Sequence, residues 1–227
     1  MTDDLRPLLA TPLSRRRLIA STAAGLAAFA SPALAQRKPA APAEVSVDEL
    51  MKAGDLPDFA LGKPDSPVTI VEYASMTCGH CANFHNKVFP ALKEKYIDSG
   101  KVRFIMREFP LDNLAAAASM LARCAGGEKS YALVGVLFEK QEQWAFVRGN
   151  PVPNLFEIAK QAGFTQDSFD KCLTDQKLLD QVTAVRTHAS EKFAVSSTPT
   201  FFINGKRLQD APTIESFDKA LAALLKS

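Results

Sequence analysis

The chain has 227 residues, of which 47% are hydrophobic, so it can form one sizeable domain or a domain with a large insertion. Its formal net charge is only +2, and this falls to zero if residues 1–35 are removed. A nucleic-acid-binding protein is expected to carry a basic face, so the charge balance argues against that class.

The first 35 residues have the pattern of an export signal. Arginines at 15–17 are followed by an apolar run from 18 to 30, and the small residues of Ala33-Leu34-Ala35 mark a cleavage site. The apolar run is shorter than the roughly 20 residues that cross a bilayer, which argues against the alternative of a membrane anchor. We expect cleavage after Ala35. The arginines resemble a twin-arginine signal, although the general secretory route also fits.

Residues 36–58 predict a connection between this leader and a folded domain. The segment is rich in Pro and Ala at first and lacks apolar periodicity, which is typical of a flexible tether. A short helix is expected between 46 and 58, with Ser46 or Asp48 as its cap.

The next segment predicts strands on either side of a helix. The β-branched run at 68–73 predicts a buried strand, and a Cys-x-x-Cys motif follows it. Apolar residues then recur at helical spacing from 82 to 97, where Pro90 is expected to kink the helix. Residues 102–107 predict a second strand.

Helical patterns fill most of the following chain. Residues 113–173 are helical in periodicity, with breaks at Gly126-Gly127 and at Pro151 and Pro153. The final part predicts a helix at 177–193, a strand at 200–203, a type I′ turn at Asn204-Gly205, a partner strand at 206–208 and a helix at 213–225. This order predicts an α/β fold in which helices interrupt the sheet midway.

The most informative motif is Cys78-Gly79-His80-Cys81, between the first strand and its helix. A helix N-terminus offers unpaired N–H groups and a partial positive charge. That environment favours a thiolate at Cys78, and the thiolate is the reactive form of cysteine. The motif therefore predicts a centre for thiol–disulfide exchange.

The four cysteines all follow the predicted cleavage site, and an exported protein can keep disulfides. Three pairings are possible. Close spacing favours Cys78–Cys81 and leaves Cys124 with Cys172, for which we predict a structural disulfide within the helical block. Two buried free thiols or a regulatory bridge are the alternatives.

The chain resembles the DsbA-type family of exported thioredoxin-fold oxidoreductases over nearly everything after Phe59. The matching segments are Val71-Glu72-Tyr73, the motif Cys78-Gly79-His80-Cys81, Phe104 to Pro110, and Val195 to Gly205 with its Thr-Pro and Asn-Gly pairs. The resemblance implies a thioredoxin-like fold with a helical domain inserted between its βαβ and ββα halves. The expected parts are 59–112, the insertion at 113–175, and 176–227.

The resemblance also implies roles for individual residues. Thr198–Pro199 should be cis and face the motif, leaving the Thr198 backbone to pair with substrate. Cys78 should be the exposed nucleophile and Cys81 the buried resolving cysteine, with Gly79 and His80 completing the catalytic motif. His80 is expected to stabilise the Cys78 thiolate and so to make the disulfide more oxidising.

Glu72 matches the buried acid of the family, which is thought to help move the proton of the inner cysteine. An outward-facing strand residue is the alternative. Arg107 or Glu108 is the expected charged neighbour, and His85 is expected to be a packing or surface histidine.

The resulting hypothesis is a monomeric periplasmic oxidoreductase that gives its Cys78–Cys81 disulfide to unfolded or partly folded exported proteins with free cysteines. It needs no dissociable cofactor or metal, and a DsbB-type membrane protein would reoxidise it. A disulfide isomerase or reductase of the same fold is the main alternative. A copper- or zinc-handling protein would have to recruit His80 or His85 to the cysteines.

Overall fold

The computed structural model describes residues 41–52 and 54–226. The predicted signal peptide, its cleavage site and the first part of the predicted tether lie outside these residues. Within the described ranges, no helix combines the length and the apolar character that crossing a membrane requires.

A five-stranded mixed sheet lies at the centre, with the order β1-β3-β2-β4-β5. Strands β2 and β3 are parallel, and the other neighbouring pairs are antiparallel. The strands are β1 (Phe59–Leu61), β2 (Val68–Ala74), β3 (Val102–Glu108), β4 (Thr200–Ile203) and β5 (Lys206–Arg207). The sequence predicted all of these except the short β1.

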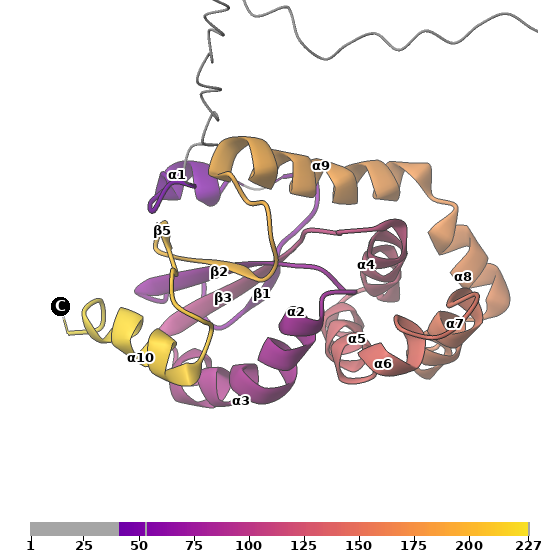
Figure 1. Ribbon diagram of the computed structural model, residues 1–227, viewed down its shortest axis with the longest axis horizontal. Coiled ribbons are helices and arrows are strands. Elements are labelled where there is room, and N and C mark those ends of the chain that lie inside the picture. Colours follow the sequence, from indigo (N-terminus) through magenta and orange to yellow (C-terminus); the bar gives the residue numbers. More distant parts are fainter. Residues whose placement is uncertain (1–40, 53, 227) are drawn as a thin grey trace, which may run out of the picture. The chain divides into compact units, whose positions relative to one another are not determined.

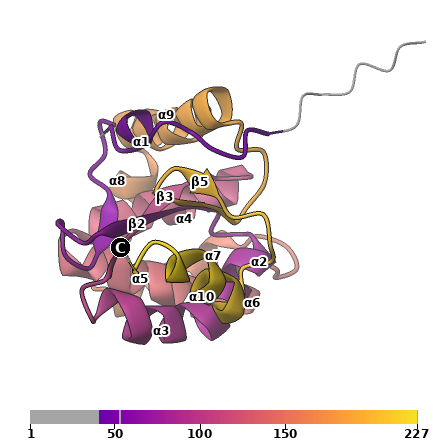
Figure 2. The same cartoon turned by 90° about the vertical axis from the view of Figure 1, so that its left-hand side faces the viewer.

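Helices cover both faces of the sheet (Figures 1 and 2). The short helix α1 (Val47–Leu50) and the long helix α9 (Gln176–Phe193) lie on one face. The opposite face carries α10 (Ile214–Ala222) and an unbroken helical run that begins at Gly79, within the Cys-x-x-Cys motif. That run consists of α2 (Gly79–Asn83), the π-helical segment η1 (Phe84–Val88), α3 (Phe89–Leu92) and the π-helical segment η2 (Lys93–Ile97).

Five further helices stand between β3 and α9 and form the block beside the sheet in Figure 1. They are α4 (Asn113–Ala125), α5 (Glu128–Glu139), α6 (Gln141–Trp144), α7 (Val152–Gln161) and α8 (Gln166–Leu173). This arrangement confirms the predicted α/β fold with helices inserted between the two halves of the sheet.

The pleat of β2 decides which side chains face the Cys-x-x-Cys helix. Alternate residues of a strand point to opposite faces. Val71 and Tyr73 pack in the hydrophobic cluster that includes α1 and α9. Val68 and Ile70 pack in the larger cluster with α2, α3 and the helical block. Glu72 shares the parity of Val68 and Ile70, so its carboxylate is buried on the same side as the motif.

The hairpin between β4 and β5 has the predicted turn. Asn204 and Gly205 both have positive φ, 45° and 82°, as a type I′ turn requires. Gly205 is needed for a second reason, because a Cβ there would lie 2.5 Å from the carbonyl oxygen of Val45.

Residues 43–45 differ from the predicted tether. The N–H of Val45 donates to Gly205 at 2.9 Å, and the N–H of Arg207 donates to Ala43 at 2.8 Å. The segment therefore pairs with β5, whose free edge offers unpaired backbone groups. The following helix is capped by Ser46 as predicted, but it ends at Leu50.

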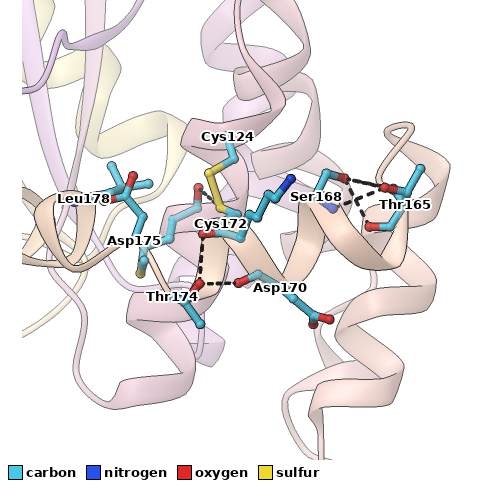
Figure 3. The surroundings of a disulfide bond; sticks show 10 residues. Cys124, Thr165, Ser168, Asp170, Cys172, Thr174, Asp175 and Leu178 are labelled. Atoms are coloured by element: carbon cyan, nitrogen blue, oxygen red, sulfur yellow. Dashed lines mark hydrogen bonds between the residues drawn. A yellow bond between two sulfur atoms is a disulfide. The ribbon is translucent and has the colours of Figure 1, made fainter.

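A disulfide joins Cys124 at the end of α4 to Cys172 in α8 (Figure 3). The two cysteines are 48 positions apart in the sequence. Cys124 is exposed and Cys172 is buried. Figure 3 also shows the start of α8, where Thr165 and Ser168 form a capping box.

Candidate active site

Cys78 occupies the N-cap of α2, immediately after a short loop from β2. Its N–H donates to the Ser75 carbonyl at 3.1 Å, which closes the loop. The Thr77 hydroxyl donates to Asp112 at 2.6 Å and anchors the loop to the start of α4. The structure therefore fixes Cys78 where the free N–H groups of a helix point toward its sulfur. The expectation of an exposed Cys78 is wrong, because the residue keeps only 9% of its accessible surface.

The pKa of the Cys78 thiol is lowered to about 5. The largest cause is the hydrogen bond with the Cys81 side chain, and burial opposes it. Interactions with Thr198 and with the backbone N–H groups of Cys81 and His80 lower the pKa further. At neutral pH Cys78 is accordingly a thiolate, the form that exchanges with disulfides.

Cys81 has the opposite environment. It is fully buried one turn into the helix, and burial raises the pKa of its thiol well above the ordinary value. The hydrogen bond from Cys81 to Cys78 and the charge of Glu72 raise it further. The two cysteines are not joined in this structure, so one motif holds a thiolate and a thiol side by side.

The loop before β4 faces this motif across the site. The Thr198–Pro199 peptide bond is cis, as the family resemblance implies. The Cys78 sulfur lies 3.3 Å from the Thr198 carbonyl oxygen, to which its thiol donates when protonated. The motif and the proline loop are 120 positions apart in the sequence, and the fold brings them into contact.

The charge of Glu72 acts on Cys81, and its carboxylate pairs with a residue that the sequence did not point to as part of the site. Its Oε2 is 2.8 Å from Nε2 of His85, and both side chains are buried. The prediction of Arg107 or Glu108 as the charged neighbour is wrong. Arg107 points to the other face of the sheet and binds Asp58 at 2.7 Å.

Glu108 also pairs with a residue other than Glu72. It shares the face of Glu72 but forms an ion pair with Arg123 of α4, with a bond of 2.8 Å to Oε2. The expectation that His85 serves only packing or the surface is incomplete, because its imidazole makes a buried hydrogen bond to Glu72.

The helical block contributes a second unexpected residue, Gln141 of α6. Its buried side-chain amide donates to the carbonyls of Met76, at 2.8 Å, and Cys78, at 3.1 Å. Trp144 of the same helix is buried and donates to Leu137, so α6 is anchored to α5 beneath the active-site loop.

The remaining motif residues face solvent. Gly79 and His80 are exposed. His80 acts on Cys78 through its backbone N–H, and a role for its imidazole stays a prediction. Over the part of the chain that the structure describes, no three His, Cys, Asp or Glu side chains are grouped to hold a metal ion.

Comparison with known proteins places this arrangement in a family. A family model described as thioredoxin matches residues 55–223. The crystal structure of alpha-DsbA1 from Wolbachia pipientis superposes with a TM-score of 0.72 and 32% identity, covering 80% of this chain and 96% of that one. The chain belongs to the DsbA-type family of thioredoxin-fold proteins.

Other members of the family are recognisably similar. A candidate protein-disulfide oxidoreductase of Rickettsia bellii is 36% identical over 154 residues, covering 67% of this DsbA-type chain. The chain spans only 59% of that relative's length and 61% of the length of a similarly named Rickettsia conorii protein. Bacillus subtilis BdbD, at 22% identity and a TM-score of 0.67, shares the fold.

Of the two site residues that the sequence did not predict, His85 and Gln141, only His85 could have been suspected from the sequence of this DsbA-type protein. His85 follows Cys81 by four positions, so the two share one face of the helix. That spacing marks His85 as a candidate for the site, but its pairing with Glu72 depends on which face of the sheet the helix packs against. Gln141 had no such signal, since its contact with the active-site loop depends on how the helical block docks.

Proposed function

We propose that this chain is an exported thiol:disulfide oxidoreductase that introduces disulfides into other exported proteins through Cys78 and Cys81. The observation that carries the proposal is the split between the two cysteines, with the Cys78 pKa lowered to about 5 and the Cys81 pKa raised. A stabilised Cys78 thiolate favours the reduced form, so the disulfide form is a strong oxidant.

The reaction proceeds by two exchanges. A substrate thiolate attacks the Cys78 sulfur, the Cys78–Cys81 bond breaks, and its electron pair stays on Cys81. A second substrate thiolate then attacks the substrate sulfur of the mixed disulfide and forms the substrate disulfide. The Cys78 thiolate departs with the electron pair, and it is a good leaving group because its pKa is low.

The proposal assigns the Thr198–Pro199 loop to substrate binding. Its Thr198 carbonyl already lies against the Cys78 sulfur, so an extended peptide joined to Cys78 would run beside this backbone. Suitable substrates are unfolded or partly folded chains with free cysteines, because only they can present a thiolate in an extended segment.

We further propose that the protein works outside the cytoplasm and depends on a membrane partner for reoxidation. The leader pattern at 1–35 supports export to an oxidising compartment, with cleavage after Ala35. An oxidase needs an acceptor for the two electrons it receives, and we assign that task to a DsbB-type membrane protein. We propose that the mature chain acts as a monomer.

The deciding measurement is the reduction potential of the mature protein in glutathione buffers. We expect a value near about −120 mV, which marks a strong oxidase. A value near about −180 mV would favour an isomerase, to be checked by refolding a substrate with scrambled disulfides. A value near about −270 mV would contradict the proposal and indicate a reductase.

One wild-type measurement and two variants test the roles of the cysteines. When a reduced two-cysteine peptide is added to the oxidised wild-type enzyme, we expect one peptide disulfide per Cys78–Cys81 disulfide consumed. C81A, treated with a peptide activated as a mixed disulfide, should retain the peptide on Cys78. C78A should retain none on Cys81 because that thiol is buried, and equal trapping by both variants would contradict the assignment.

A further inference from the structure

The buried pair formed by Glu72 and His85 has features that packing does not explain. The two residues come from β2 and η1, and their side chains keep 0% and 5% of their accessible surface. Burial of a carboxylate is costly unless it is paired. His85 supplies one partner at 2.8 Å, while Oε1 of Glu72 has no hydrogen-bond partner among the described residues.

The unpartnered oxygen belongs to a carboxylate that acts on the resolving cysteine. The charge of Glu72 raises the pKa of Cys81, so the two groups are electrostatically coupled inside the protein. Cys81 itself is fully buried and has no direct exposure to water. A proton that enters or leaves its sulfur must therefore travel through protein groups, and Glu72 is the acid coupled to it.

Of the three residues Cys81, Glu72 and His85, only His85 has a side chain that reaches the surface. Its side chain retains 5% exposure, whereas Glu72 and Cys81 have none. The imidazole is also held firmly. It stacks on Phe138 of α5, with ring centroids 4.3 Å apart, and it contacts Phe84 and Phe89 from its own helical run.

We propose that His85 is the positioning and proton-exchanging partner of Glu72, so that the Glu72–His85 pair carries the proton between the Cys81 sulfur and solvent. The inference rests on the proposed thiol–disulfide exchange and adds a residue and a route to it. Histidine suits this place because its ordinary pKa lies near neutrality, which lets it both take up and release a proton.

In the oxidising direction, a substrate thiolate bonds to Cys78, and the electron pair of the broken disulfide stays on the Cys81 sulfur. A proton that His85 has taken up from solvent passes through the pair to that sulfur, and this leaves neutral His85 beside the Glu72 carboxylate in the reduced form. In the reverse step Cys81 gives its proton to the pair and attacks Cys78, displacing the bound thiolate.

The surroundings leave few other groups for this task. The charge of Glu72 acts on the thiol of Cys81 in α2 and on the phenol of Tyr131 in α5. Burial and the charge of Glu72 raise the pKa of Tyr131, so its phenol stays protonated at neutral pH. Among the described residues, no hydrogen bond, ion pair or ring contact joins a Lys or Arg to either member of the pair.

The test follows the step in which Cys81 must lose its proton. Reduced protein is mixed with oxidised glutathione, quenched with acid and analysed by mass spectrometry. The first step gives glutathione on Cys78, and the second gives the Cys78–Cys81 disulfide. In H85Q, where the amide donates to Glu72 but does not accept a proton, we expect the second step to slow about 100-fold at pH 7.

The pH profile separates proton transfer from a structural role. Between pH 6 and 9 the H85Q second step should rise about tenfold per pH unit, because hydroxide then removes the proton. The wild-type rate should rise far less. H188Q is the matched control, since His188 lies on α9 and packs against Phe193 away from the motif. An H85Q profile parallel to that of wild type would overturn the inference.

A measurement on the wild type keeps the inference testable if H85Q does not fold. The chain has three histidines, His80, His85 and His188, so ¹⁵N imidazole spectra are simple. At pH 7 the His85 nitrogens should change protonation between the oxidised and reduced forms, while those of His188 should not. Unchanged His85 nitrogens would overturn the inference. Absence of the first glutathione step in wild type would instead contradict the proposed function.

Discussion

At the scale of single residues, identical side chains have opposite properties because their surroundings differ. Cys78 caps a helix and receives hydrogen bonds that lower its pKa to about 5, whereas burial raises the pKa of Cys81. A separation of only three positions thus produces a nucleophile and a protected resolving group. The difference arises from one turn of helix, because Cys78 keeps 9% of its accessible surface at the helix start whereas Cys81 keeps none.

The lowered pKa of Cys78 predicts a pH-dependent gap in stability between the reduced and oxidised forms. Its folded pKa of about 5 lies below the ordinary value of 9.0, so it stabilises the reduced form above pH 9 and loses this effect as pH falls toward 5. The disulfide form has no such titration. The Tm of the reduced protein minus that of the oxidised protein should therefore fall between pH 8 and pH 4.

Calorimetry of both redox forms at each pH checks this expectation. Cys81 hardly disturbs the comparison below pH 8, because its thiol pKa is raised in the folded protein and has the ordinary value of 9.0 in the unfolded chain. A Tm difference that stays constant or grows as the pH falls would show that the Cys78 pKa is not lowered in the folded protein.

At the scale of elements, a four-residue helix of the inserted block holds the active-site loop. Gln141 in α6 donates to the Met76 and Cys78 carbonyls, which lie on either side of Thr77. The Cys78 carbonyl also accepts from the N–H of Ala82. The helical block is thereby tied to the backbone that carries the nucleophile, and this contact limits how far the two can separate.

Removing that amide should cost stability. Q141L leaves the Met76 carbonyl without this buried donor, and such a loss costs about 1–3 kcal/mol in the free energy of unfolding. Gln143 of the same helix is exposed, so Q143L provides the matched control and should change the free energy by less than about 0.5 kcal/mol. Denaturant unfolding measures both, and equal effects would show that the hydrogen bonds of Gln141 do not matter.

At the scale of the whole molecule, covalent and ionic links join the helical block to itself and to the sheet. The Cys124–Cys172 disulfide connects α4 with α8. The buried Glu108–Arg123 pair connects β3 with α4. None of these four residues is among the hydrogen-bond partners of Cys78, so we expect the links to hold the block together rather than to act on the exchange chemistry.

We expect the Cys124–Cys172 disulfide to be structural. C124A/C172A should lower the free energy of unfolding by about 2–4 kcal/mol, because the bridge restricts the unfolded chain. The rate at which iodoacetamide modifies Cys78 should stay unchanged. Unfolding of the oxidised variant and of wild type by denaturant provides the comparison. A changed Cys78 rate with no loss of stability would favour the regulatory alternative.

Local patterns in the sequence determined most of the secondary structure of this protein and the position of its nucleophile. The strand at 68–73, the helical segment at 113–173 and the Asn204-Gly205 turn each follow from short-range spacing or from a residue's own backbone preference. Cys78 could be identified from its motif in the same way, because the helix that stabilises its thiolate is formed by the residues that follow it directly in the sequence.

Only the tertiary structure decided the contacts between distant segments. Glu72 could be paired correctly only once the pleat of β2 and the docking of the following helix were known, because a shift of one residue turns a strand side chain to the other face. Arg107 lies on the wrong face for that reason, and His85 on the right one. Gln141 and the pairing of residues 43–45 with β5 likewise depend on packing between elements, which no local pattern encodes.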